Sequence, residues 1–295
     1  MNPNFFIVGA AKSGTTSLAN YLAEHPKIAT PKLKEPRFFV KDALVNINDR
    51  DPMKEYILKN SVLKKEEYLK MFKSPKEDTR LKFDASVHYL YHCGEAIPKI
   101  KTQIGDVPII ILLRNPSERA ISSANYSKNW HDNNLEHELS QEELRIKEGY
   151  NSFWFHKNQG LYSSQIKAYL DNFSNVKIIL FDDLIKNPKL IVNEVFQFLS
   201  LEQLEMEKYP THNTSFEANK ALKIIRKTKV LSTIKKLIGS KNWKKVRTSS
   251  KSLFFKNSSK EITKKLEDKL YQFYEKDVEK IESLIGKKLP EWKKK

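Results

Sequence analysis

Residues 5–22 read FFIVGAAKSGTTSLANYL, and this stretch decides the fold. The apolar run 5–8 predicts a buried strand, and the apolar positions 18, 21 and 22 predict one face of a helix. Small residues and one lysine form a short turn between them. Such a strand, turn and helix point backbone N–H groups, hydroxyls and a cation at a single place. The stretch therefore predicts an anion-binding loop, with an ordinary capped turn as the alternative.

The spacing of this loop differs from that of nucleotide triphosphatases. Their loop places four residues between two glycines and its lysine after the second glycine. Here four residues separate Gly9 from Gly14, but Lys12 precedes the second glycine. The sequence predicts a shorter cradle for a phosphate or sulfate group, with Lys12 at its tip. Its other predicted ligands lie at the start of the helix and are Ser13, Gly14, Thr15, Thr16 and Ser17.

Apolar runs followed by helical patterns recur along the chain. Strands are predicted at 108–113 and 176–181, with shorter ones at 27–30 and 81–85. One helix is predicted from about Pro116, and another follows Asp182 and Asp183 and ends near Leu199; 130–150 is predicted as a mobile excursion. This alternation predicts an α/β, P-loop-like fold of three layers, in which helices flank a central parallel sheet. Ligands of such folds gather at the carboxyl ends of the strands.

The composition predicts one domain over 1–295. The chain has no apolar run of about 18 residues and no signal peptide, and it begins at its first strand. These features predict a cytoplasmic enzyme of bacterial type. Cys93 is the single cysteine; together with His88 and His92 it has a zinc-like spacing, but no fourth ligand is apparent, so no metal is expected.

The net charge of +17 is concentrated in one segment. Residues 218–260 contain fourteen Lys and Arg residues and no acidic residue. This segment predicts contact with a polyanion, an anionic membrane surface or an acidic substrate, and a membrane-peripheral location. A solvated lysine-rich surface is the alternative. An apolar pattern at helical spacing then predicts a C-terminal helix over 261–286.

A second anion site is predicted where the strand 108–113 ends. The sequence continues as RNPSERAIS at 114–122, in which Pro116 fixes the start of a helix. Arg114 and Ser122, two turns apart, suit a phosphate monoester. Arg114 paired with an acid is the alternative. Two anion sites at neighbouring strand ends predict a ligand with phosphates at both ends.

These motifs resemble those of a known family. GAAKSGTTSL at 9–18 and RNPSERAIS at 114–122 resemble the two nucleotide motifs of sulfotransferases that use 3′-phosphoadenosine 5′-phosphosulfate (PAPS). KEPRFF at 34–39 looks like the general-base segment of the heparan-sulfate type of carbohydrate sulfotransferase, and VKIILFDDLIKNP at 176–188 follows the order of that type. Ala85 stands where that type usually has a lysine. The resemblance covers nearly the whole chain and implies a single sulfotransferase domain.

The resemblance implies a role for each motif. Lys12 would neutralise charge on the oxygen that joins phosphate to sulfate, and residues 13–17 would hold the 5′-phosphate. Arg114 and Ser122 would hold the 3′-phosphate. Glu35 would take a proton from the acceptor; a surface carboxylate paired with Lys34 is the alternative. No metal is needed, because Lys12 and the loop supply positive charge.

The acceptor expected from the resemblance is a hydroxyl or amine of a carbohydrate or glycolipid. Arg37, His88 and Trp130 are predicted to border its cleft, and the choice between O- and N-sulfation stays open. Two other functions compete with this one. The first is an ATP-dependent small-molecule kinase with a variant loop. The second is a polyanion-binding or nucleic-acid-binding protein, although the basic segment has few aromatic residues for base stacking, so no specific nucleic acid is expected.

Overall fold

A computed structural model describes residues 2–73, 79–128, 130–131, 133–206, 208–210, 216–218, 255–257 and 264–293, with 216–218 and 255–257 described as backbone only. Its centre is a five-stranded sheet with the order β2-β3-β1-β4-β5, in which every neighbouring pair is parallel. The strands are β1 (Phe5–Gly9), β2 (Ile28–Ala29), β3 (Leu81–Asp84), β4 (Ile109–Leu113) and β5 (Val176–Leu180). The predicted α/β class with a central parallel sheet is confirmed.

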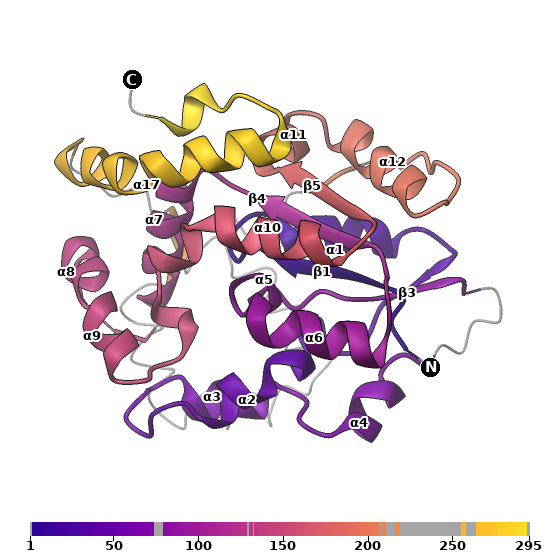
Figure 1. Cartoon of the computed structure of the whole chain (residues 1–295), viewed down its shortest axis with the longest axis horizontal. Coiled ribbons are helices and arrows are strands. Elements are labelled where there is room, and N and C mark those ends of the chain that lie inside the picture. Colours follow the sequence, from indigo (N-terminus) through magenta and orange to yellow (C-terminus); the bar gives the residue numbers. More distant parts are fainter. Residues whose placement is uncertain are drawn as a thin grey trace.

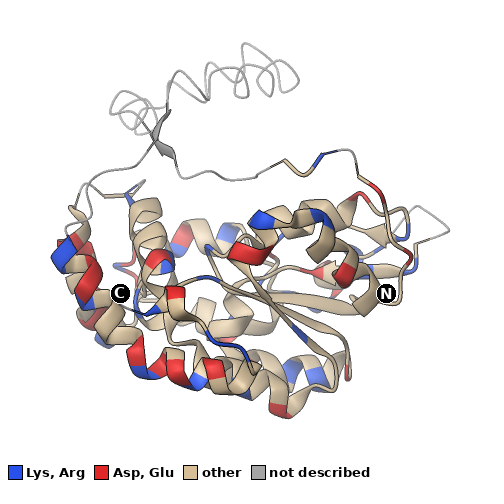
Figure 2. Ribbon diagram, turned by 90° about the horizontal axis from the view of Figure 1, so that it is seen from above, with Lys and Arg blue, Asp and Glu red and all other residues tan. Residues whose placement is uncertain are grey.

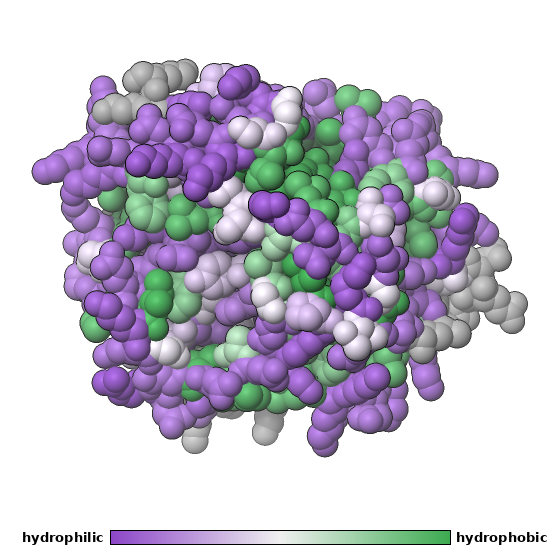
Figure 3. Space-filling model, viewed as in Figure 1, coloured by the Kyte–Doolittle hydropathy of each residue, from purple (hydrophilic) through white to green (hydrophobic). Residues whose placement is uncertain are grey.

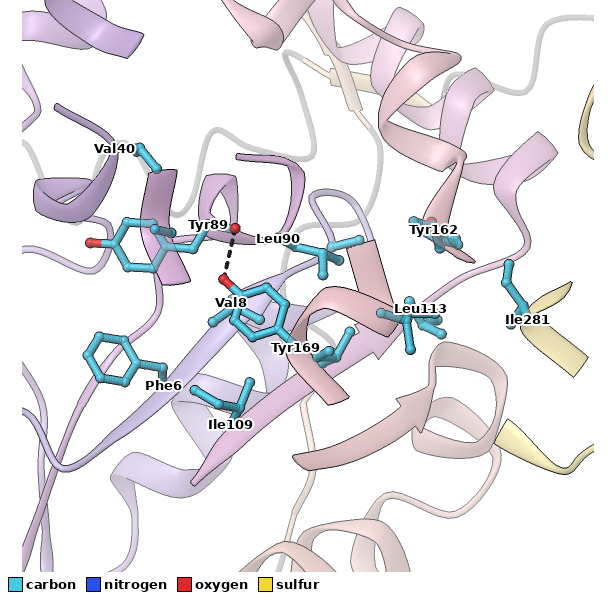
Figure 4. Close-up of a cluster of buried hydrophobic side chains, with 14 of the residues drawn as sticks. Phe6, Val8, Val40, Tyr89, Leu90, Ile109, Leu113, Tyr162, Tyr169 and Ile281 are labelled. Carbon is cyan, nitrogen blue, oxygen red and sulfur yellow. Dashed lines mark hydrogen bonds between the residues drawn. The ribbon is translucent and has the colours of Figure 1, made fainter. Parts of the chain in front are cut away.

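Two hydrophobic cores cover the two faces of the sheet because side chains alternate along each strand. In β1, Phe6 and Val8 belong to one core, while Phe5 and Ile7 belong to the other. Figure 4 shows the first core, where the Tyr169 hydroxyl donates a hydrogen bond of 2.9 Å to the Tyr89 carbonyl oxygen. All five residues of β1 are buried, which explains why the strand reads as a continuous apolar run.

Helices form the outer layers (Figure 1). Buried residues of α6 (Cys93–Gln103), α10 (Tyr162–Asn172) and α17 (Lys264–Ile285) pack in the first core, and those of α1 (Thr15–Ala23) and α12 (Pro188–Phe198) pack in the second. The other helical elements are η1 (Phe38–Val40), α2 (Lys41–Val45), α3 (Lys54–Lys59), α4 (Lys65–Lys70), α5 (His88–Tyr91), α7 (Pro116–Ser127), α8 (Leu135–Ser140), α9 (Glu142–Lys147), η2 (Ser152–Trp154), η3 (Asn158–Gly160), α11 (Phe181–Lys186) and η4 (Pro290–Trp292).

Two segments differ from the sequence prediction. The single helix predicted after Asp182 and Asp183, ending near Leu199, is two helices, because Pro188 begins α12 and Asn187 before it leaves the α-helical conformation. The excursion predicted at 130–150 contains α8 and α9, and it is anchored by two buried carboxylates. Glu138 and Glu142 are 0% and 2% exposed.

Charged residues lie mainly on the outer helices and loops, whereas the central strands are mostly uncharged (Figure 2). The face shown in Figure 3 is largely hydrophilic, with smaller hydrophobic areas between the charged side chains. No helix among the described residues is both long and apolar enough to cross a bilayer. The backbone of β6 (Phe216–Ala218) pairs antiparallel with β7 (Phe255–Asn257). Apart from these backbone positions, the basic segment 218–260 lies outside the described residues, as do residues 261–263 of the predicted C-terminal helix.

Candidate functional site

The loop between β1 and α1 is held in shape by glycine and by the neighbouring strand. Gly14 has a φ of +85°, and a Cβ there would lie 2.9 Å from the Phe181 ring. The Ala10 N–H donates to the Leu112 carbonyl of β4 at 2.7 Å, which ties the loop to the next strand. No side chain caps the start of α1 at Gly14. The fully buried Ser13 hydroxyl lies next to the hydroxyl of the fully buried Tyr162. The loop therefore presents unused donors where an anion would sit.

Lys12 lies at the tip of this loop among other cations. Burial, together with the positive charges of Arg114, Arg119 and Lys34, lowers the pKa of Lys12 to about 8, while Glu35 acts in the opposite direction. A lysine in such surroundings keeps its charge best when an anion binds beside it. Its ammonium lies 4.2 Å from the centroid of the Tyr126 ring, within range of a cation–π contact.

Glu35 lies next to the loop and is connected to it by Lys34. The Lys34 ammonium donates to the Thr16 hydroxyl at 2.7 Å and to a Glu35 oxygen at 3.4 Å. The other Glu35 oxygen accepts from the Arg37 guanidinium at 2.8 Å. Burial raises the pKa of Glu35, but Lys34 and Arg37 outweigh it and the net pKa is lowered. Its side chain is 21% exposed, so the ionised carboxylate is open to a proton donor.

Arg114 follows β4, and the helix after it starts as the sequence predicts. The Asn115 side chain accepts from the Ser117 and Glu118 N–H groups, and Pro116 occupies the first turn. The Arg114 guanidinium donates twice to Glu118, at 3.1 and 2.8 Å, and lies 4.8 Å from the Phe181 ring centroid. In this structure Arg114 is therefore paired with an acidic residue, Glu118, as the alternative interpretation of the sequence predicts. Ser122 is half-buried two turns along α7.

The sheet topology explains why these residues gather. β3, β1 and β4 are neighbours and parallel, so their carboxyl ends share one edge. The segment after β3 carries His88, the loop after β1 carries Lys12, and Arg114 follows β4. Glu35 comes from the connection after β2, which pairs with β3. The predicted residues thus come from four adjacent strand ends.

The three predicted acceptor residues lie in two places. Burial, together with nearby Arg37, lowers the pKa of His88 to about 3, so the imidazole is neutral near pH 7. Arg37 and His88 therefore lie on the Glu35 side of the site. Trp130 belongs to an aromatic group on the Lys12 side, where its ring centroid is 5.5 Å from that of Tyr126.

Sequence reasoning missed two features near the site. Arg119 is fully buried and lies close enough to Lys12 to lower its pKa; one of its N–H groups donates to the His156 carbonyl. Glu138 is the acceptor for Arg145 and, at 3.0 Å, for both His131 and His156. The position of Arg119 within RNPSER, five residues after Arg114, was a usable signal. The partners of Glu138 are spread over 131–156 and give no local pattern.

Comparisons with known proteins bear on this site. The family model described as "Sulfotransferase domain" matches residues 2–284. A crystal structure of a sulfotransferase from Alicyclobacillus acidocaldarius is 28% identical, covers 99% of both chains and superposes with a TM-score of 0.76.

Curated relatives include three whose names describe sulfotransferases. Membrane-associated sulfotransferase kil1 of Dictyostelium discoideum is 32% identical over 43% of this chain and 24% of its own length. Bifunctional heparan sulfate N-deacetylase/N-sulfotransferase 4 of Mus musculus is 26% identical over 68% of this chain and 22% of its own. Carbohydrate sulfotransferase 15 of Mus musculus is 25% identical over 75% of this chain and 48% of its own. The chain thus spans less than half the length of each of these relatives.

Proposed function

The chain belongs to the sulfotransferase family, as its two anion-binding motifs predict, and on this premise we propose that it transfers a sulfuryl group from PAPS to a hydroxyl or amine of a carbohydrate or glycolipid. The observation that carries the proposal is the partly buried Lys12, whose pKa is lowered to about 8 among Arg114, Arg119 and Lys34. A site with this excess of positive charge fits a ligand that has a phosphosulfate at one end and a second phosphate at the other.

Each residue at the strand edge has a proposed part in binding the donor. Residues 13–17 hold the 5′-phosphate with the loop N–H groups and hydroxyls, and Lys12 contacts the oxygen between phosphorus and sulfur. Arg114 and Ser122 hold the 3′-phosphate. The Arg114–Glu118 pair joins partly exposed side chains one helical turn apart, and such pairs contribute only about 0.5 kcal/mol. A phosphate can therefore replace the Glu118 carboxylate as the partner of the Arg114 guanidinium.

The transfer step follows from these positions. The acceptor oxygen or nitrogen attacks sulfur, the bond from sulfur to the bridging oxygen breaks, and the proton of the acceptor goes to Glu35. Lys12 stabilises the charge that develops on the bridging oxygen, which leaves with adenosine 3′,5′-bisphosphate. Lys34 keeps Glu35 beside the loop through its contact with Thr16. The names of the relatives support a carbohydrate acceptor, and Arg37, His88 and Trp130 are proposed to border it.

We propose a cytoplasmic location, in which the basic segment 218–260 reaches an anionic surface.

Thermal stabilisation by three ligands tests the proposed function against its alternatives. Adenosine 3′,5′-bisphosphate should raise the melting temperature, and ATP with magnesium or a generic oligonucleotide should raise it much less. A larger shift with ATP and magnesium would favour the kinase alternative. A larger shift with the oligonucleotide would favour the polyanion-binding alternative.

The affinity for adenosine 3′,5′-bisphosphate should fall as the pH rises from 7 to 9. The pKa of Lys12 is lowered to about 8, so its charge is lost over this range, whereas the ligand phosphates are already ionised. An anion raises the pKa of the lysine it contacts, so the dissociation constant should rise by up to about tenfold per pH unit above the free-state pKa. Calorimetric titrations at several pH values measure this slope. In Lys12→Arg the slope should disappear, because arginine stays charged; the same slope in that variant would assign it to another group.

Removing the carboxylate that pairs with Arg114 should strengthen donor binding. Glu118→Gln frees the guanidinium and removes a negative charge beside the 3′-phosphate site. An interaction of about 0.5 kcal/mol corresponds to a gain in affinity of roughly twofold to threefold. Glu136→Gln, which breaks the exposed pair with Lys269, is the matched control and should leave the affinity unchanged. Weaker binding by Glu118→Gln would mean that Glu118 positions Arg114 for the ligand.

A further inference from the structure

Four aromatic side chains form a continuous group beside Lys12, and we call them the aromatic platform: Tyr56, Tyr126, Trp130 and Phe153. Trp130 is its centre, with ring centroids 6.1 Å from Tyr56, 5.5 Å from Tyr126 and 5.1 Å from Phe153. The three contacts are tilted or edge-to-face, with interplanar angles of 60°, 67° and 77°. Such contacts leave more of each ring face accessible than parallel stacking does.

The platform is assembled from three separate parts of the chain. Tyr56 belongs to α3, Tyr126 to α7 and Phe153 to η2. Trp130 and Phe153 pack against a small core that includes Trp154 and Phe155, which fixes their positions. Tyr56 and Tyr126 are 50% and 45% exposed. Large aromatic side chains that are fixed on one side and exposed on the other are typical of a binding surface.

One end of the aromatic platform, Tyr126, lies next to Lys12. The Tyr126 ring centroid lies 4.2 Å from the Lys12 ammonium, which the proposed function places at the oxygen between phosphorus and sulfur. A ring bound on the platform therefore lies next to the sulfuryl group. Lys34 and Glu35 lie close to Lys12, and Lys34 and Arg37 both donate hydrogen bonds to Glu35. An acceptor here meets an aromatic surface on one side and charged groups on the other.

We propose that the aromatic platform is the acceptor subsite and that it selects a sugar in its closed, pyranose form, a proposal that rests on the proposed function. One face of a pyranose carries C–H groups, which suit the electron-rich faces of aromatic rings, and its edge carries hydroxyls or amines. Stacked on the platform, the sugar turns that edge toward Lys12 and Glu35. Tyr56, Tyr126 and Trp130 are thereby specificity-determining residues.

The test measures acceptor binding with the bisphosphate product already bound. Wild-type protein saturated with adenosine 3′,5′-bisphosphate is titrated calorimetrically with unsulfated hexosamine-containing oligosaccharides, and with the open-chain alditol of the same hexosamine. Wild type should bind at least one oligosaccharide and bind the alditol much more weakly. Trp130→Ala should lose about tenfold in oligosaccharide affinity, since an aromatic contact of this kind contributes about 1.4 kcal/mol. Trp130→Phe should retain most of the affinity.

The controls separate this proposal from folding defects and from the proposed function. Tyr56→Ala changes an exposed side chain and should lower oligosaccharide affinity several-fold without changing the melting temperature. Phe273→Ala removes an aromatic ring on α17 that is 44% exposed and should have no effect on affinity. Failure of wild type to bind any oligosaccharide, or unchanged affinity in both Trp130→Ala and Tyr56→Ala, would overturn the proposal. Loss of bisphosphate binding by wild type would instead contradict the proposed function.

Discussion

Lys12→Ala should lower the turnover of sulfuryl transfer by about 10²- to 10³-fold, the usual cost of removing one preorganised group that stabilises a leaving oxygen. Lys12 is partly buried in the loop between β1 and α1, close to the positive charges of Arg114, Arg119 and Lys34. In such surroundings a charge that develops on a leaving oxygen interacts strongly with the ammonium. Alanine removes this interaction and leaves the other cations in place, so binding of adenosine 3′,5′-bisphosphate should weaken far less than turnover.

Single-turnover kinetics with labelled PAPS measure the effect on transfer. Lys189→Ala, on the exposed surface of α12, is the matched control because it also removes one positive charge. Equal losses in bisphosphate affinity and in turnover rate would show that Lys12 serves binding alone.

Glu35→Gln should lower turnover by about 10²- to 10⁴-fold and keep the affinity for adenosine 3′,5′-bisphosphate within a few-fold of wild type. The amide is nearly the same size as the carboxylate but cannot accept the acceptor proton. The net pKa of Glu35 is lowered, so the wild-type enzyme should keep an ionised base down to a pH below the ordinary range of glutamate. The acidic limb of its pH–rate profile should lie there and should be absent in Glu35→Gln.

Glu35 also pairs with Arg37, so a structural effect must be separated from a chemical one. Glu35→Asp keeps the charge with a shorter side chain and should recover part of the turnover. Full turnover by Glu35→Gln would remove Glu35 as the base.

The fold could be predicted where a single segment contains its own signal. β1 and β4 are buried along their whole length, so each reads as an apolar run. The break between α11 and α12 was missed, although Pro188 marks it. The acidic residues Glu138 and Glu142 make the segment 130–150 look polar in the sequence, although both carboxylates are buried in the structure. Some of their partners, among them His156 and the Lys157 N–H group, come from beyond that segment.

The position of the site in the fold could be predicted in part, because it follows from the order of the strands. Parallel neighbouring strands place their following residues at one edge, so the meeting of Lys12 and Arg114 at that edge follows from the order of strands. The lowered pKa of Lys12 depends on Arg119 and Lys34, which lie far from it in the sequence. The aromatic platform joins α3, α7 and η2, and no sequence spacing connects them. Its detection required the folded structure.

The most direct test of the account compares the affinities of adenosine 3′,5′-bisphosphate and adenosine 5′-monophosphate, measured by calorimetry on wild type and Arg114→Ala. The two ligands differ only in the 3′-phosphate, for which Arg114 and Ser122 are the proposed ligands. Wild type should bind the bisphosphate roughly 10- to 100-fold more tightly, as expected for charge-assisted hydrogen bonds of about 1.5–3 kcal/mol, and Arg114→Ala should lose most of this preference. Equal affinities of wild type for the two ligands would contradict a PAPS site at this edge of the sheet.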